Sequence, residues 1–186
     1  FSAGFRNHYD IAFDARGKLF TFDSDMEWDI GLPWYRAVRL VHVVPGGEYG
    51  WRTSSSCWPQ WYADSLPPVL ETGRGSPTGM CLCTGTQFPP RLRGALLAGD
   101  WSQGQILAFK ATPKGAGYAA TSEIVLRGHP LNVTDLEMAG DGSLVARDAE
   151  EVARFLVTLR ANRRSYDALL GLLLEARRRA DEAVTR

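Results

Sequence analysis

Short apolar segments separated by tight turns recur through most of the chain. Turns of the form D-x-x-G, or close variants of it, follow apolar segments at residues 14–17, 100–104 and 140–142. Aspartate and glycine favour tight hairpin connections, and alternating apolar and polar residues on either side favour strands. Repeated hairpins of this kind predict a mainly β fold, either a β-propeller or a β-sandwich.

The strand-forming segments are regularly spaced. A propeller blade contains four strands, so these segments supply two blades and part of a third within residues 1–147. They read YDIAFDARGKLFTF from residue 9, AVRLVHVVPGGEYGW from residue 37, GALLAGDWSQGQILAFKATPKGAGY from residue 94 and LNVTDLEMAGDGSLVAR from residue 131.

The chain changes character near residue 147. All six tryptophans and all ten prolines lie before residue 131, and a single glycine, Gly171, follows Gly142. Asp148 and Glu151 have the spacing of a helix capping box. Apolar residues then recur at helical spacing, at Val152, Phe155, Leu156 and Leu159 and again in residues 169–174. Residues 148–186 are therefore predicted to form a helical hairpin that packs as an appendage.

Composition excludes some functions. The 186 residues include 21 basic and 21 acidic side chains and have no net charge, so bulk charge indicates no nucleic-acid partner. No apolar run approaches the roughly 20 residues of a membrane span. Because the chain begins at Phe1 rather than methionine, we expect it to be the interior of a longer polypeptide, and the lack of a signal peptide is uninformative.

Three cysteines are present: Cys57, Cys81 and Cys83. In a strand, the C-L-C pair lies on one face, two rises of about 3.3 Å apart, which is near the limit of disulfide geometry. No C-x-x-C pair suggests a metal or haem site. Free or buried thiols are the favoured interpretation.

Alternation in FTFDSDMEWDIG, residues 20–31, predicts one strand that carries four carboxylates on one side. They are Asp23, Asp25, Glu27 and Asp29, here called the carboxylate ladder. Clustered oxygen ligands suit calcium, which takes six to eight of them. An EF-hand is excluded because, counted from Asp23, the sixth loop position holds Trp28 instead of glycine.

Two interpretations of the ladder remain open. In the first, Asp23 and Asp25 bind a cation together with backbone carbonyls, while the other two carboxylates pair with Arg36 or Arg39. In the second, all four carboxylates are solvated or form salt bridges with these arginines.

Five motifs within residues 4–145 occur in the order found in one family. They are GFRNHYDIAFDARGKLFTFDSDMEWDIG, VVPGGEYGWR, GSPTGM, GDWSQGQILA and PLNVTDLEMAGDGSL. This order resembles the glucose/sorbosone dehydrogenase-like β-propellers, in particular the membrane-bound dehydrogenase domain proteins of planctomycete-type bacteria.

The resemblance implies an incomplete six-bladed propeller from an exported, periplasmic or otherwise extracytoplasmic protein. It implies the quinone cofactor PQQ, calcium, a sugar or alcohol substrate and a c-type cytochrome as electron acceptor. The reaction would be hydride transfer from a hydroxyl-bearing carbon to the quinone. Because such a site draws residues from several blades, the 186-residue chain by itself is expected to be inactive.

The resemblance also assigns residues. Arg6 and Asn7 match the pair that contacts the quinone, and the calcium loop matches residues 23–26. His8, at the inferred pocket rim, is a candidate base. The chain departs from the pattern where the family places cations that hold the quinone, since its residues there are neutral: Ser102, Asn132 and Thr134.

These departures leave a second function open, a non-catalytic propeller that binds carbohydrate or protein and uses calcium as a brace. Its aromatic residues would stack on sugar faces, although aromatic side chains also commonly fill blade interfaces. The aromatic residues concerned are Trp34, Tyr35, Trp58, Trp61 and Tyr62.

Overall fold

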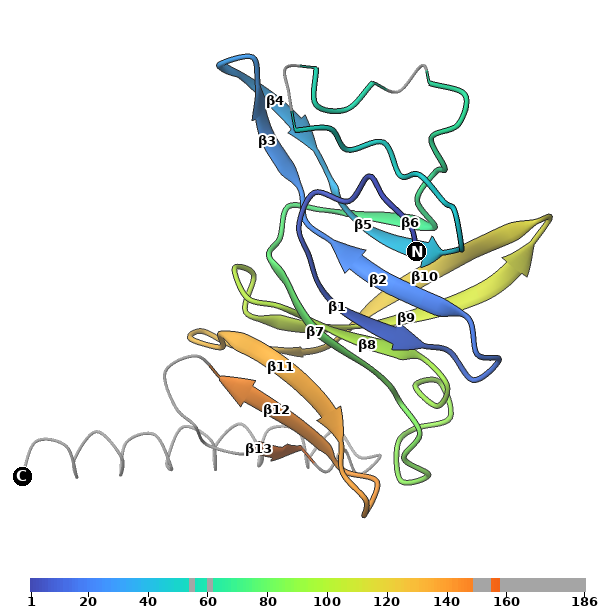
Figure 1. Ribbon diagram of the computed structural model, residues 1–186. Helices are drawn as coiled ribbons and strands as arrows, with labels where there is room; N and C mark the ends of the chain where they lie inside the picture. The colour runs from blue at the N-terminus through green and yellow to red at the C-terminus, as the bar shows by residue number, and fades with distance from the viewer. Residues whose placement is uncertain (54–55, 60–61, 149–154, 158–186) are drawn as a thin grey trace, which may run out of the picture.

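The structure is a computed structural model that describes residues 1–53, 56–59, 62–148 and 155–157, in which all regular structure is β-strand (Figure 1). The strands are β1 (His8–Phe13), β2 (Leu19–Asp23), β3 (Met26–Asp29), β4 (Leu32–Arg36), β5 (Val38–Val43), β6 (Leu70–Gly73), β7 (Pro77–Leu82), β8 (Leu96–Asp100), β9 (Gln105–Lys114), β10 (Gly117–Arg127), β11 (Val133–Met138), β12 (Leu144–Asp148) and β13 (Phe155–Val157). The mainly β prediction is confirmed for this part of the chain.

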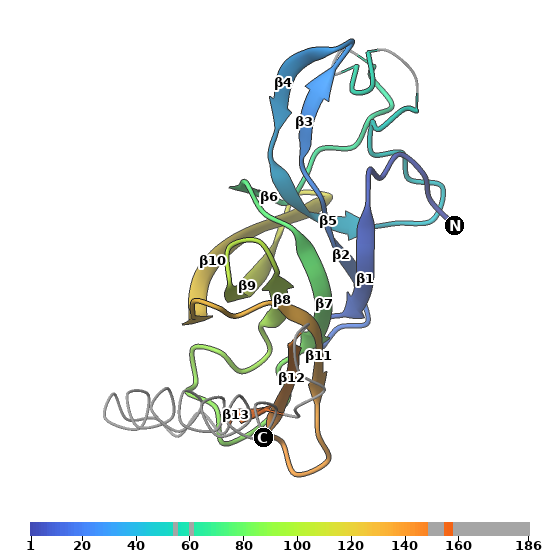
Figure 2. The same cartoon turned by 90° about the vertical axis from the view of Figure 1, so that its left-hand side faces the viewer.

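Three antiparallel sheets account for most strands. The first sheet has the order β1-β2-β5-β6, the second has the order β7-β8-β9-β10, and the third contains β11-β12-β13. A separate hairpin, β3–β4, extends away from the first sheet (Figures 1 and 2). The predicted hairpins β1–β2, β8–β9 and β11–β12 are all confirmed by their antiparallel pairing.

Aspartate side chains close two of these hairpins. At the β1–β2 turn, the amide of Gly17 donates to the Asp14 carbonyl at 2.9 Å, and the Asp14 carboxylate accepts from the amides of Arg16 and Lys18, each at 2.9 Å. At the β11–β12 turn, Asp141 accepts from the amide and hydroxyl of Ser143 at 2.9 and 2.7 Å. The aspartate carboxylates thus accept from backbone amides of the turn, in place of a backbone carbonyl. This explains why aspartate recurs in these turns.

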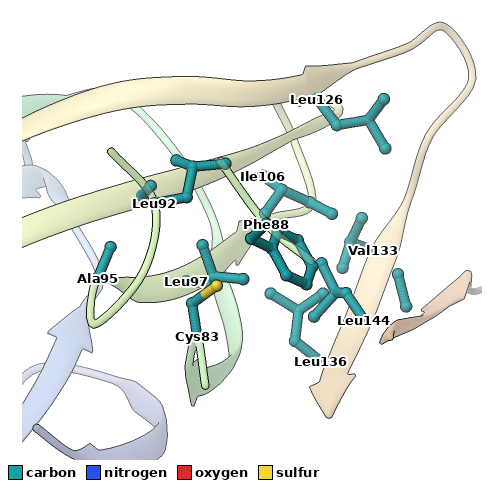
Figure 3. Close-up of a cluster of buried hydrophobic side chains, with 12 residues drawn as sticks. Cys83, Phe88, Leu92, Ala95, Leu97, Ile106, Leu126, Val133, Leu136 and Leu144 are labelled. Atoms are coloured by element: carbon teal, nitrogen blue, oxygen red, sulfur yellow. The ribbon is translucent and has the colours of Figure 1, made fainter. Parts of the chain in front are cut away.

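Apolar side chains fill the space between neighbouring sheets. One cluster joins the first sheet to the second and includes Phe20, Phe22, Leu40, Leu96 and Phe109, all nearly inaccessible to solvent. A second cluster joins the second sheet to the third (Figure 3); its members include Phe88, Leu97, Ile106, Leu136 and Leu144. Each sheet therefore packs face to face on the next, as propeller blades do.

The first strands of the three sheets, β1, β7 and β11, lie next to one another (Figure 2). The Met80 amide of β7 donates to the Asp10 carboxylate of β1 at 2.7 Å, and the Thr78 hydroxyl donates to the Val133 carbonyl of β11 at 2.8 Å. We call the first strand of each sheet its inner strand. Hydrogen bonds thus link the inner strand of each sheet to the inner strand of the next sheet.

Two expectations differ from the structure. Residues 20–31 are not one strand: β2 ends at Asp23 and pairs with β1 and β5, whereas β3 begins at Met26 and pairs with β4. Asp148, expected to begin a helix, ends strand β12. Phe155–Val157, whose spacing suggested the same helix, form β13, because the free edge of β12 offers them antiparallel pairing. The remainder of the predicted helical hairpin lies outside the described residues.

Among the described residues, no helix has the length and apolar character needed to cross a membrane.

Candidate functional site

The segment that carries Arg6 and Asn7 runs along the loop after β5. The Tyr49 amide donates to the Ala3 carbonyl at 3.0 Å, and the Trp51 amide donates to the Gly4 carbonyl at 2.9 Å. Gly4 has a positive φ of 84°, and a Cβ there would lie 2.6 Å from the Tyr49 nitrogen. Only glycine permits this close approach, which explains its place in GFRN.

Asp23 fixes the backbone of the two residues expected to contact the quinone. The Asn7 amide donates to Asp23 Oδ1 at 2.9 Å, and the Arg6 amide donates to Oδ2 at 3.1 Å. Arg39 donates to the same Oδ2 through Nη2 at 2.8 Å and Nε at 3.1 Å. Asp23 and Arg39 are 0% and 2% exposed, so the ion pair is shielded from water.

Arg39 also contacts the surrounding loops. Its Nη1 donates to the Tyr49 carbonyl at 2.6 Å, its Nη2 donates to the Gly4 carbonyl at 3.0 Å, and its Cζ lies 4.0 Å from the centroid of the Trp58 ring. Burial lowers the pKa of the Arg39 guanidinium, and the adjacent Asp23 carboxylate opposes this shift. The loop after β5 is thereby tied to β2 and β5.

The side chains of the matched residues lie at the edge of this assembly. Arg6 is partly buried, with Nη1 3.4 Å from the Ser24 hydroxyl and Cζ 5.8 Å from the Trp51 ring centroid. Asn7 is exposed. His8 is exposed as well, and its ring centroid lies 4.7 Å from that of Phe5. Arg6, Asn7 and His8 therefore form a short, partly to fully accessible segment before and at the start of β1, here called the rim.

The four carboxylates of the ladder do not converge. Asp23 is bound to Arg39, Glu27 pairs with Arg74 at 2.8 Å, and Asp29 accepts from the Cys57 amide at 2.9 Å. Glu27 and Asp29 therefore bind other partners than the Arg36 or Arg39 of the first interpretation. The ion pair of Asp23 with Arg39, which strand pairing brings together, agrees with the second interpretation.

Asp25 is buried in the connection between β2 and β3. Burial raises the pKa of its carboxyl, and the nearby Glu27 raises it further. In the part of the chain that the structure describes, no three histidine, cysteine, aspartate or glutamate side chains lie close enough to hold a metal ion. Both carboxylate oxygens of Asp23 already accept hydrogen bonds from Arg39 or backbone amides. The four separated carboxylates therefore do not fit a calcium ion held by the ladder.

The neutral residues at the expected quinone-clamping positions are engaged locally. The Ser102 hydroxyl donates to Asp100 at 3.3 Å, the Asn132 amide donates to the Trp101 carbonyl at 3.4 Å, and the Thr134 hydroxyl donates to the Arg147 carbonyl at 3.3 Å. These positions supply no positive charge to the rim.

The aromatic residues separate into two groups. Trp34, Tyr35 and Tyr62 are exposed, whereas Trp58 packs on Arg39 and belongs to the scaffold. Trp61 lies outside the described residues.

Comparison with known proteins gives a structural match without a sequence match. No family model matches the sequence, and no curated protein matches it. Among solved structures, a glucose dehydrogenase-type oxidoreductase from Thermus thermophilus superposes with a TM-score of 0.61 at 19% identity, over 80% of this chain and 41% of that one.

Two further structures agree. The PQQ-bound aldose sugar dehydrogenase of Streptomyces coelicolor has a TM-score of 0.59 at 19% identity, over 80% of this chain and 39% of that one. The soluble aldose sugar dehydrogenase of Escherichia coli, in its apo form, has a TM-score of 0.61 at 17% identity, over 78% of this chain and 42% of that one.

The fold is that of the glucose and aldose sugar dehydrogenase β-propellers. The chain spans about two-fifths of the length of these matched structures. Three successive sheets packed face to face are the corresponding part of such a propeller, and they confirm the resemblance in fold.

Sequence reasoning named Arg39 as an ion-pair partner of the ladder and Trp58 as an aromatic candidate, but it missed that they pack together behind the rim. It missed Trp51 altogether. One signal was available in the strands that follow the turns. β2, β8 and β12 read LFTFD, LLAGD and LVARD, and each is preceded two residues earlier by a glycine. An aspartate repeated at the end of equivalent strands indicates a structural role shared by the blades.

Proposed function

We propose that this chain forms part of a quinone-dependent sugar or alcohol dehydrogenase propeller, in which Arg6 and Asn7 contact the quinone. The observation that carries the proposal is the rim itself: an accessible guanidinium and an exposed amide are presented by a backbone segment that buried groups hold in place. The fold shared with a PQQ-bound aldose sugar dehydrogenase supports it.

The residues of the rim fit a quinone that carries carboxylates. The Arg6 guanidinium offers charge-assisted donors, and the Asn7 amide offers both a donor and an acceptor. When bound, PQQ supplies a two-electron acceptor for a hydride from the carbon that bears the substrate hydroxyl. We propose that Arg6 and Asn7 orient the ligand and that His8, beside them, holds the proton of the substrate hydroxyl.

Calcium has no place in this proposal at the carboxylate ladder, because the oxygens of Asp23 are already bound by Arg39 and two amides. The wider setting follows the resemblance: an extracytoplasmic protein that passes electrons to a c-type cytochrome.

A titration of the 186-residue chain with PQQ, followed by tryptophan fluorescence, tests the proposal. Arg6→Ala and Asn7→Ala should each weaken PQQ binding by about tenfold, because a charge-assisted or amide hydrogen bond is lost. Arg16→Ala is the matched control: Arg16 is exposed at the β1–β2 turn, at the opposite end of β1 from the rim, and its loss should leave affinity unchanged. Absence of PQQ binding by the parent chain would contradict the proposal.

A non-catalytic propeller that binds carbohydrate or protein is the second candidate. Two features favour it. Ser102, Asn132 and Thr134 supply no positive charge to hold a quinone. Trp28, Trp34 and Tyr35 of the β3–β4 hairpin are exposed. Binding of sugars without PQQ, lost on Trp34→Ala and retained on Arg6→Ala, would support this candidate over the first.

A further inference from the structure

We propose that Asp23 and Arg39 form a positioning unit that fixes the backbone of Arg6 and Asn7 and thereby sets the direction of their side chains. Both residues are buried, so they act on a ligand only through Arg6 and Asn7. The link to quinone binding rests on the proposed function; the link to the backbone of residues 6 and 7 does not.

The hydrogen bonds of the Asp23 carboxylate join the Arg6 and Asn7 amides to Arg39. One carboxylate oxygen accepts from the Asn7 amide, and the other accepts from the Arg6 amide and from Arg39. Arg6 and Asn7 lie outside any strand, so the neighbouring ladder of β1 does not hold their amides. A buried carboxylate that accepts several N–H groups is a strong and directional acceptor.

Arg39 holds this carboxylate in place. It offers two donors to Asp23 and further donors to the carbonyls of Gly4 and Tyr49, while Trp58 covers its face. The guanidinium therefore joins β2, the loop after β5 and the segment that leads to the rim. Lysine could not reproduce this planar set of contacts.

The second sheet repeats the arrangement without the arginine. Asp100, which ends β8 as Asp23 ends β2, is 2% exposed and accepts from the Ser76 amide at 2.8 Å. Ser76 immediately precedes the inner strand β7, as Asn7 precedes β1. A strand-final aspartate thus holds the entry to the inner strand in both sheets, which assigns Asp23 to the scaffold and not to a metal.

Hydrogen exchange of the full 186-residue chain, resolved by residue with NMR, tests the unit without any ligand. Asp23→Asn should speed exchange of the Arg6 and Asn7 amides by at least about tenfold and leave the Ser76 amide unchanged. Asp100→Asn, the matched control, should do the reverse. Should Asp23→Asn fail to fold, Asp23→Glu keeps the charge but displaces the carboxylate, and the same local change is expected.

Equal acceleration at all three amides in both variants would show only general loss of stability and would overturn the proposal, as would unchanged exchange at Arg6 and Asn7. A PQQ titration of the Asp23 variant separates the two proposals. If the parent chain binds PQQ, this variant should bind it about tenfold more weakly, as Arg6→Ala does. If the parent chain does not bind PQQ, the proposed function fails, while the exchange pattern still decides the positioning role.

Discussion

At the scale of single residues, burial explains the state of two of the three cysteines, Cys81 and Cys83. Cys57, Cys81 and Cys83 remain thiols and form no disulfide, as the sequence predicted. Cys83 is 1% exposed within the cluster between the second and third sheets, and Cys81 packs against that cluster. Burial raises the pKa of Cys81 to about 12, with a further contribution from Cys83. Reactive cysteines are thiolates in accessible positive surroundings, so these two clustered thiols are structural.

Alkylation with iodoacetamide at pH 8 should therefore be very slow at Cys81. With a pKa of about 12, its thiolate fraction is on the order of 10⁻⁴, so the rate should fall about a thousandfold from that of the same thiol in the urea-unfolded chain. Mass spectrometry of timed samples distinguishes the three cysteines. Native Cys81 labelling at the unfolded rate would show that this thiol is not buried as described.

At the scale of elements, the packing of β7 against β11 depends on a residue without a side chain. Gly79 takes the place in β7 that Asp10 has in β1 and Asp135 has in β11. A Cβ on Gly79 would lie 2.6 Å from both the Asp135 Cα and the Leu136 nitrogen. Gly79 has no side chain that could accept a hydrogen bond from the Met80 amide. That amide therefore donates to the Asp10 carboxylate of the preceding sheet.

Gly79→Ala should accordingly lower the free energy of unfolding by about 2 kcal/mol or more, because backbone atoms of β11 must move. Gly117→Ala is the matched control, since nothing lies within 4 Å of its added Cβ, and a change below about 0.5 kcal/mol is expected there. Urea titrations followed by tryptophan fluorescence measure both. Equal effects of the two substitutions would mean that the inner strands do not pack this closely.

At the scale of the whole molecule, an apolar strip along β1 remains uncovered, whereas Thr21 and Val41 beside it on the same face are buried. Apolar side chains on one side of β1 remain exposed: Tyr9 by 65%, Ile11 by 51% and Phe13 by 59%. The opposite side of the same sheet packs on the second sheet through Ala12, Phe20 and Phe22. An apolar strip on an edge strand favours association.

The double substitution Ile11→Thr with Phe13→Thr should reduce self-association of the chain and leave its melting temperature nearly unchanged, because these side chains contribute little to the core. Sedimentation velocity over a concentration series measures association. Ile124→Thr, an exposed apolar residue of β10 at 49%, is the control and should have no effect. If the double variant associates as strongly as the parent, the strip on β1 is not the surface responsible.

The sequence alone determined the parts that depend on local pattern. Turn residues at Asp14, Gly17 and Gly142 defined the hairpins, because turn chemistry and strand alternation act over a few residues. The order of five motifs gave a resemblance to one propeller family, and the matched structures confirm that resemblance in fold. The resemblance assigned Arg6, Asn7 and His8 to a ligand-binding rim, and their side chains lie accessible directly before and at the start of β1.

Tertiary structure decided the partners of the carboxylates. Alternation in residues 20–31 indicated that Asp23, Asp25, Glu27 and Asp29 share one side, but the chain leaves β2 at Asp23, and the last two belong to a different hairpin. Asp23 meets Arg39 only because β2 pairs with β5, and it meets the Arg6 and Asn7 amides only because the first residues fold back along the loop after β5. A charge pattern fixes which side chains are available, whereas strand pairing and burial select the donor that each carboxylate binds, and that selection made Asp23 a scaffold residue.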